Sequence, residues 1–68
     1  MLDVDYLVER RRMERLRLKD MAEKLGYASP NGYWRLEKGI SRATVDHLVK
    51  LTKIFDEPIE NFIKQVKS

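Results

Sequence analysis

Cysteine is absent from this 68-residue chain, and histidine occurs once, at position 47. Without thiolates the chain can form no disulfide framework, and a single histidine cannot complete a zinc finger. No apolar run reaches the length of about 18–20 residues that a membrane-spanning helix needs, and the first residues are acidic where a signal peptide needs basic ones. We therefore expect a cytoplasmic protein with no metal, no cofactor and no membrane partner.

Glycine and proline are scarce, with three and two residues respectively, and β-branched residues do not alternate with polar ones. Strands therefore have little support, whereas apolar residues recur at spacings of three and four, the pattern of helices with one buried face. The pattern predicts five helices over residues 3–14, 18–25, 30–38, 44–55 and 58–66. Because a chain this short holds only one modest core, we expect a single all-α domain over residues 1–68.

Capping and turn residues fall between the predicted helices. Gly26 suits the end of the second helix, and Ser29 followed by Pro30 suits the start of the third. Either Ser41 or Thr44 can cap the fourth. The second and third helices are thus joined by a tight turn, which leaves the third projecting from the surface, where it fits a major groove about 12 Å wide.

Basic residues outnumber acidic ones by 14 to 11, so the formal charge of the chain is +3. This balance favours polyanionic partners only weakly, because many proteins with other functions are equally basic. The distribution is more informative, since residues 10–19 hold six lysines and arginines but only one acid, Glu14.

Taken together, these elements resemble the Cro/repressor-like (XRE) helix-turn-helix family of phage, plasmid and bacterial regulators. The resemblance covers nearly the whole chain and rests on Met-Ala-Glu-Lys-Leu-Gly at 21–26, Tyr33-x-x-Leu36-Glu37-Lys38-Gly39, Val45-x-x-Leu48-x-x-Leu51 and Ile59-x-x-Phe62-Ile63. It implies a compact five-helix bundle, the lambda-repressor-like DNA-binding domain, whose third helix reads double-stranded DNA. It also implies a transcriptional regulator, most often a repressor, that binds a short palindromic operator as a homodimer.

Site residues follow from the same resemblance by matching positions. It places Ser29, Pro30, Asn31 and Arg35 at base edges, with Gly32 and Trp34 beside them, and it gives phosphate contacts to Lys38, Ser41 and Arg42. Arg17 and Leu18 stand where the family usually has Ser or Thr followed by Gln, so Arg17 or Lys19 is expected to supply that phosphate contact. A buried salt bridge between Arg11 and Glu37 is implied to orient the third helix. The segment from Gly26 to Glu37 is one residue longer than the commonest spacing, which leaves the register of the reading residues open by one position.

The chemistry of the third helix suits base recognition. The guanidinium of Arg35 matches the O6 and N7 acceptors of guanine, and the amide of Asn31 matches N6 and N7 of adenine. Residues 29–32 also fit a type I turn, so Asn31 and Gly32 have two interpretations each, the turn or DNA contact. Trp34 is expected to face outward, either against a thymine methyl or a sugar, or sealing the edge of the core.

The last predicted helix carries an apolar stripe. A helix this short can hardly bury the whole stripe, so part of it is expected to form a dimer contact. The stripe comprises Ile59, Phe62, Ile63 and Val66.

The alternative to a DNA-binding regulator is a protein-interaction module with the same fold, such as an antitoxin or antirepressor. Its signature would be an acidic or apolar third helix, whereas this one carries Arg35 and Lys38. A protein partner that modulates activity is compatible with DNA binding. An enzyme with a small-molecule substrate is the weakest interpretation, because the sequence has no nucleophile-base pair, no glycine-rich phosphate loop and no metal cluster.

Overall fold

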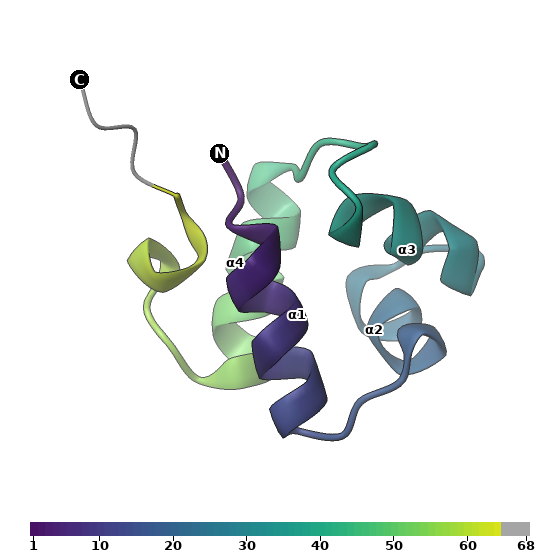
Figure 1. Cartoon of the computed structure of the whole chain (residues 1–68), viewed down its shortest axis with the longest axis horizontal. Coiled ribbons are helices and arrows are strands. Elements are labelled where there is room, and N and C mark those ends of the chain that lie inside the picture. Colours follow the sequence, from purple (N-terminus) through teal and green to yellow (C-terminus); the bar gives the residue numbers. More distant parts are fainter. Residues whose placement is uncertain (65–68) are drawn as a thin grey trace.

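The computed structural model describes residues 1–64 (Figure 1). It has four α-helices, α1 (Val4–Met13), α2 (Leu18–Leu25), α3 (Pro30–Glu37) and α4 (Val45–Phe55), followed by a short 3₁₀ helix, η1 (Ile59–Phe62). The predicted all-α class is confirmed, and the first four predicted helices agree with the observed ones to within one residue at each end. None of the helices in residues 1–64 combines the length and the apolar character needed to cross a membrane.

Local capping explains these boundaries. The carboxylate of Asp3 accepts a hydrogen bond from the backbone N–H of Tyr6 (3.2 Å) at the start of α1. Thr44 Oγ1 accepts from the N–H of His47 (3.1 Å) while His47 Nδ1 accepts from the N–H of Thr44 (3.2 Å), so Thr44 caps α4. Gly26 ends α2 at a φ of 86°, a left-handed conformation that glycine adopts without steric cost.

The fifth predicted helix differs from the structure in type and length. Its 3₁₀ turn ends at Phe62, and Ile63 is extended and forms an isolated antiparallel bridge with Leu2. The N–H of Asp3 donates to the carbonyl of Phe62 and the N–H of Lys64 donates to the carbonyl of Met1, both at 2.8 Å. Pairing with the start of the chain thus satisfies backbone groups that a longer helix would have satisfied internally.

Side chains also hold η1 against α1. The carboxylate of Glu57 accepts hydrogen bonds from the hydroxyl of Tyr6, from Arg10 Nε and from Asn61 Nδ2. The bond from the Tyr6 hydroxyl is the main reason why the pKa of Glu57 lies below its ordinary value of 4.5. The end of the described chain is therefore fixed to the first helix by both backbone and side-chain contacts.

Every helix contributes to one hydrophobic core. Its buried members are Leu7 of α1, Met21, Ala22 and Leu25 of α2, Tyr33 and Leu36 of α3, Leu51 and Phe55 of α4, and Phe62 of η1. Phe62 is fully buried and packs against the rings of Tyr6 and Phe55. The expected dimer contact is therefore wrong for Phe62, and Val66 of the same stripe lies outside the described residues.

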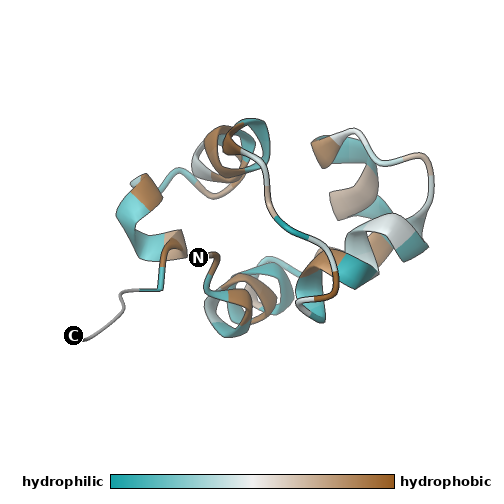
Figure 2. Ribbon diagram, turned by 90° about the horizontal axis from the view of Figure 1, so that it is seen from above, coloured by the Kyte–Doolittle hydropathy of each residue, from teal (hydrophilic) through white to brown (hydrophobic). Residues whose placement is uncertain are grey.

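The helices are arranged along an elongated molecule of 36 × 24 × 20 Å. Figure 1 shows α2 and α3 together at one end of the longest axis and η1, in yellow, at the other, with α1 and α4 between them. Figure 2 gives the view from above, in which the connection from α3 to α4 crosses the face nearest the reader. This arrangement leaves α3 at an end of the molecule with one of its faces exposed.

Candidate nucleic-acid interface

The faces of α3 are clearly divided. Tyr33 and Leu36 are buried in the core, whereas five other side chains are exposed and fall on one side at helical spacing. The exposed residues, which we call the α3 strip, are Pro30, Asn31, Trp34, Arg35 and Lys38. The structure thus selects one register for the outward-facing positions, which the sequence left open by one residue.

Asn31 and Arg35 of the α3 strip carry hydrogen-bonding side chains that are free to meet a ligand. Within residues 1–64, the side chains of Asn31 and Arg35 make no hydrogen bond or ion pair with the protein. The carbonyl of Arg35 is engaged, because it accepts the N–H groups of Ile40 (2.9 Å) and Ser41 (3.3 Å) and so fixes the chain that follows α3. The side chains of Asn31 and Arg35 can therefore bind a partner without breaking an internal contact.

The remaining strip residues and Ser29 surround these two. Ser29 is exposed just before α3, with extended backbone and no capping hydrogen bond from its side chain, and Pro30 occupies the first turn. Trp34 is exposed, and the ammonium group of Lys38 lies 5.9 Å from the centre of its ring. An indole beside an ammonium and a guanidinium combines apolar and cationic surface on the same face of α3.

Gly32 does not belong to this face. A methyl group added at Gly32 would lie 2.9 Å from Tyr27 Cδ1, so position 32 points at the ring of Tyr27 and the base-edge assignment is wrong for it. The N–H of Gly32 donates to the carbonyl of Ser29 at 3.1 Å, so the predicted turn over residues 29–32 is present as the first turn of α3. The glycine is needed because the Tyr27 ring occupies the space beside α3.

Tyr27 is a supporting residue that the sequence did not identify. Its ring is half-buried in the turn between α2 and α3, edge-on to Tyr33 (6.5 Å between centres) and 5.1 Å from the ring of His47 on α4. The Tyr27 ring therefore packs between the start of α3 and the first turn of α4. The only sequence signal was the extra residue in this turn, which gave no indication of the contact with Gly32.

Two basic residues lie at the start of α2. Arg17 and Lys19 are both exposed, and Arg17 Nε is 3.5 Å from the carboxylate of Asp20. The same carboxylate accepts the backbone N–H of Arg17 at 2.8 Å, and this bond holds the pKa of Asp20 below its ordinary value. Because an exposed ion pair of this kind contributes little, the Arg17 guanidinium can exchange its partner for a phosphate at small cost.

Ser41 and Arg42 follow α3 but differ in exposure. The hydroxyl of Ser41 is buried without a hydrogen-bond partner among residues 1–64, and its N–H is taken by the carbonyl of Arg35. The expected phosphate contact is therefore wrong for Ser41. Arg42 is exposed, so its guanidinium is accessible to a phosphate.

An ion pair connects the end of α3 to α1. Arg11 Nε lies 2.5 Å from Glu37 Oε2, and Arg11 Nη2 lies 3.3 Å from Glu37 Oε1, while Arg11 Nη1 donates to the carbonyl of Leu16 at 2.9 Å. The side chains of Arg11 and Glu37 are only 12% and 6% exposed. Burial, together with the nearby Glu37 carboxylate, raises the pKa of the Tyr33 hydroxyl. The structure thus brings together the two residues expected to orient the reader helix.

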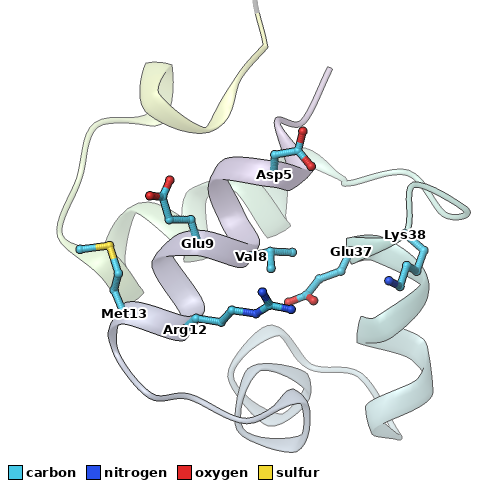
Figure 3. Close-up of a pocket in the computed structure, with 7 residues that line it drawn as sticks. All are labelled: Asp5, Val8, Glu9, Arg12, Met13, Glu37 and Lys38. Atoms are coloured by element: carbon cyan, nitrogen blue, oxygen red, sulfur yellow. The ribbon is translucent and has the colours of Figure 1, made fainter.

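Figure 3 shows the Glu37 side chain extending from α3 toward α1, next to an open groove. The groove carries charges of both signs, with Asp5, Glu9 and Arg12 on α1 and Lys38 at the end of α3. Its mixed lining contrasts with the α3 strip, in which the charged side chains are both cations.

Comparison with known proteins agrees with this geometry. No curated protein and no solved structure matches the chain significantly. A protein-family model described as helix-turn-helix matches residues 7–62, from the first core residue of α1 to the last residue of η1. The chain therefore belongs to the Cro/repressor-like (XRE) helix-turn-helix family of DNA-binding transcription regulators.

Proposed function

We propose that this chain is a repressor that recognises a short, palindromic double-stranded DNA operator as a homodimer. The observation that carries the proposal is the α3 strip, where Asn31 and Arg35 have unengaged side chains and no acidic residue is exposed. α3 has eight residues, so it is about 12 Å long, comparable with the width of the major groove.

Each reading residue has a matching base edge. The Arg35 guanidinium fits the O6 and N7 acceptors of guanine, and a good bidentate pair gives about 1–3 kcal/mol of discrimination. Asn31 fits adenine in the same two-point manner. Trp34 offers apolar surface to a thymine methyl, while Ser29 and Pro30 lie at the end of α3 that enters the groove first.

Three basic residues, one within the strip and two beside it, suit contacts with phosphates. Arg17 and Lys19 lie at the start of α2, which in this docking crosses the DNA backbone, and Lys38 lies at the end of α3. Each neutralised phosphate adds about 0.9 to the slope of log affinity against log salt concentration. Binding should therefore weaken steeply as salt rises.

Two copies are needed for useful specificity. A reader helix about 12 Å long covers only about four base pairs at 3.4 Å each, too few to single out an operator. A symmetric dimer doubles this site and places two reader helices about 34–36 Å apart, one helical turn of DNA. A dimer bound across a promoter would exclude RNA polymerase and so repress transcription.

The alternative is a protein-interaction module, such as an antitoxin or antirepressor, with no DNA contact. We favour DNA because the outward charges of α3 are Arg35 and Lys38, whereas a protein-binding helix of this fold would present acidic or apolar side chains. The helix-turn-helix family to which the chain belongs is a family of DNA-binding regulators, which favours this function over an enzymatic one.

The test compares binding to a selected operator and to a scrambled duplex of equal length by fluorescence anisotropy. Arg35→Ala should weaken binding to the operator by about 1–3 kcal/mol and leave binding to the scrambled duplex nearly unchanged. Lys53→Ala is the control, because it removes the same charge from the last turn of α4. Equal losses on both duplexes would remove Arg35 from base reading.

A further inference from the structure

We propose that Tyr27 and His47 are positioning residues for the reader helix, so that α3 recognises its operator fully only while His47 is uncharged. We call these two side chains, which lie ring against ring, the aromatic brace. The effect on DNA binding rests on the proposed function, whereas the coupling of His47 to α3 rests on the fold alone.

Tyr27 connects the end of α2 to the start of α3. Its backbone N–H donates to the carbonyl of Ala22 at 2.8 Å, which fixes the residue to the last turn of α2. Its side chain lies against Gly32, where an added Cβ would be 2.9 Å from Cδ1 and 3.4 Å from Cγ of the tyrosine. Gly32 belongs to the first turn of α3 and directly follows Asn31. The Tyr27 ring therefore sets how closely the reading end of α3 approaches α2.

His47 supports the Tyr27 ring from the side of α4. The centres of the two rings are 5.1 Å apart and their planes are inclined at 32°, so one ring largely faces the other. The imidazole is itself held by the capping box of α4, in which His47 Nδ1 accepts the backbone N–H of Thr44 at 3.2 Å. The first turn of α4 thus fixes the imidazole, the imidazole supports the tyrosine ring, and this ring positions α3 through Gly32.

Protonation of His47 is incompatible with this arrangement. An imidazolium carries a proton on both ring nitrogens, so neither nitrogen can accept the N–H of Thr44, and turning the ring over does not restore the bond. A cation–π contact with Tyr27 would require the charged ring to stay in place, with its own N–H directed at the N–H of Thr44. The ring must therefore turn away from Thr44, and this movement removes the support of the Tyr27 ring.

The groups around His47 offer a proton no compensating partner. Asp46, the neighbouring acid, is already paired with Lys50 on the same helix at 3.0 Å. From the turn before α3 the imidazole faces Tyr27, whose phenol stays neutral because burial raises its pKa. The connection before α4 contributes a cation, Arg42, and a positive charge in the first turn of α4 also opposes the helix dipole. The hydrogen bond lost from the capping box is thus not replaced.

The aromatic brace affects sequence recognition more than overall DNA affinity. Contacts with phosphates tolerate a small shift of α3 against α2, whereas two-point hydrogen bonds from Asn31 and Arg35 to base edges require an exact position. The ratio of the affinities for operator and scrambled DNA therefore reports on the brace. His47 is the only histidine of the chain, and histidine is the side chain that ordinarily changes its charge between pH 5 and 8. A change of this ratio with pH is thus the expected signature.

The first experiment measures this ratio by fluorescence anisotropy at about pH 7.5 and about pH 5.5, at constant ionic strength. The wild-type ratio should fall about fivefold at the lower pH, the effect of one lost hydrogen bond. His47→Gln keeps a capping acceptor that does not titrate, so its ratio should change by less than about twofold. Tyr27→Leu should lower the ratio at both pH values, whereas Tyr27→Phe, which keeps the ring, should respond to pH like the wild type. Circular dichroism checks that each variant is folded at both pH values.

The second experiment needs no DNA and follows the backbone amide of Gly32 by NMR as His47 titrates. Because the Tyr27 ring lies against Gly32, this signal should move with the imidazole signals in the wild type and stay in place in Tyr27→Leu. A Gly32 signal that ignores the titration, a wild-type ratio that does not fall, or an equal fall in His47→Gln would overturn the proposal. Equal wild-type affinity for both duplexes at about pH 7.5 would instead refute the proposed function, and the Gly32 signal would still decide whether His47 is coupled to α3.

Discussion

Replacing Arg11 with methionine removes one partner of a bidentate ion pair and strands the other, Glu37, in the interior. The expected loss is about 3–5 kcal/mol, the usual cost of leaving one charge of a buried pair uncompensated. The hydrogen bond from Arg11 to the Leu16 carbonyl is lost as well, which contributes about 1 kcal/mol. A domain of 68 residues has a total stability of only about 3–10 kcal/mol, so Arg11→Met should be barely folded at 25 °C.

The matched variant replaces both partners. In Arg11→Met/Glu37→Met no charge remains to be compensated, and two apolar side chains of similar volume fill the site, so most of the lost stability should return. Urea unfolding followed by circular dichroism gives the free energies of the wild type, both single variants and the double variant, and hence the coupling energy. A loss below about 1 kcal/mol in Arg11→Met, or a coupling energy near zero, would refute this account of the pair.

Three further variants test other features of the fold by the same unfolding measurement. Gly32→Ala should destabilise the fold by about 1–2 kcal/mol, because the added methyl group meets the ring of Tyr27. In a Tyr27→Ala background the same change should stabilise the fold by up to about 1 kcal/mol, because alanine favours the helix more than glycine does. A gain in stability when Tyr27 is present would contradict the contact. Arg15→Gly should stabilise by up to about 1 kcal/mol, since Arg15 has a φ of 56°, and no gain would mean that the left-handed backbone is not strained. Glu57 has a lowered pKa, so its ionised form stabilises the fold above its ordinary pKa of 4.5, and this contribution disappears as the pH falls through the lower folded-state value. Glu57→Gln should therefore lose stability less steeply below about pH 5 than the wild type. An unchanged dependence of stability on pH would contradict this role of Glu57.

The helices and the exposed face of α3 could be predicted because their signals are local. The spacing of Tyr33 and Leu36 places both in the core, and Trp34 and Arg35 between them then face outward. Thr44 and His47 form a capping box within four residues, so the predicted start of α4 lies within one residue of the observed start. Such features depend on neighbours within one or two turns.

Apart from the contact of Tyr27 with Gly32, the features that could not be predicted depend on residues distant in the sequence. The end of η1 pairs with the start of the chain, which shortened the fifth helix and buried Phe62. Ser41 is polar and follows a basic helix, yet its hydroxyl is covered in the folded chain. Arg11 and Glu37 stand 26 positions apart, and only the family resemblance indicated their contact.

The central claim is that the α3 strip reads a DNA sequence, and it is tested most directly by selecting bound duplexes from a random pool at roughly physiological salt. The account predicts one enriched palindrome, with two half-sites whose centres are about one helical turn apart, and its loss when the selection is repeated with Arg35→Ala. Recovery of no motif, with binding that depends on salt alone, would contradict sequence reading by α3 and leave the protein-interaction module as the better account of this chain.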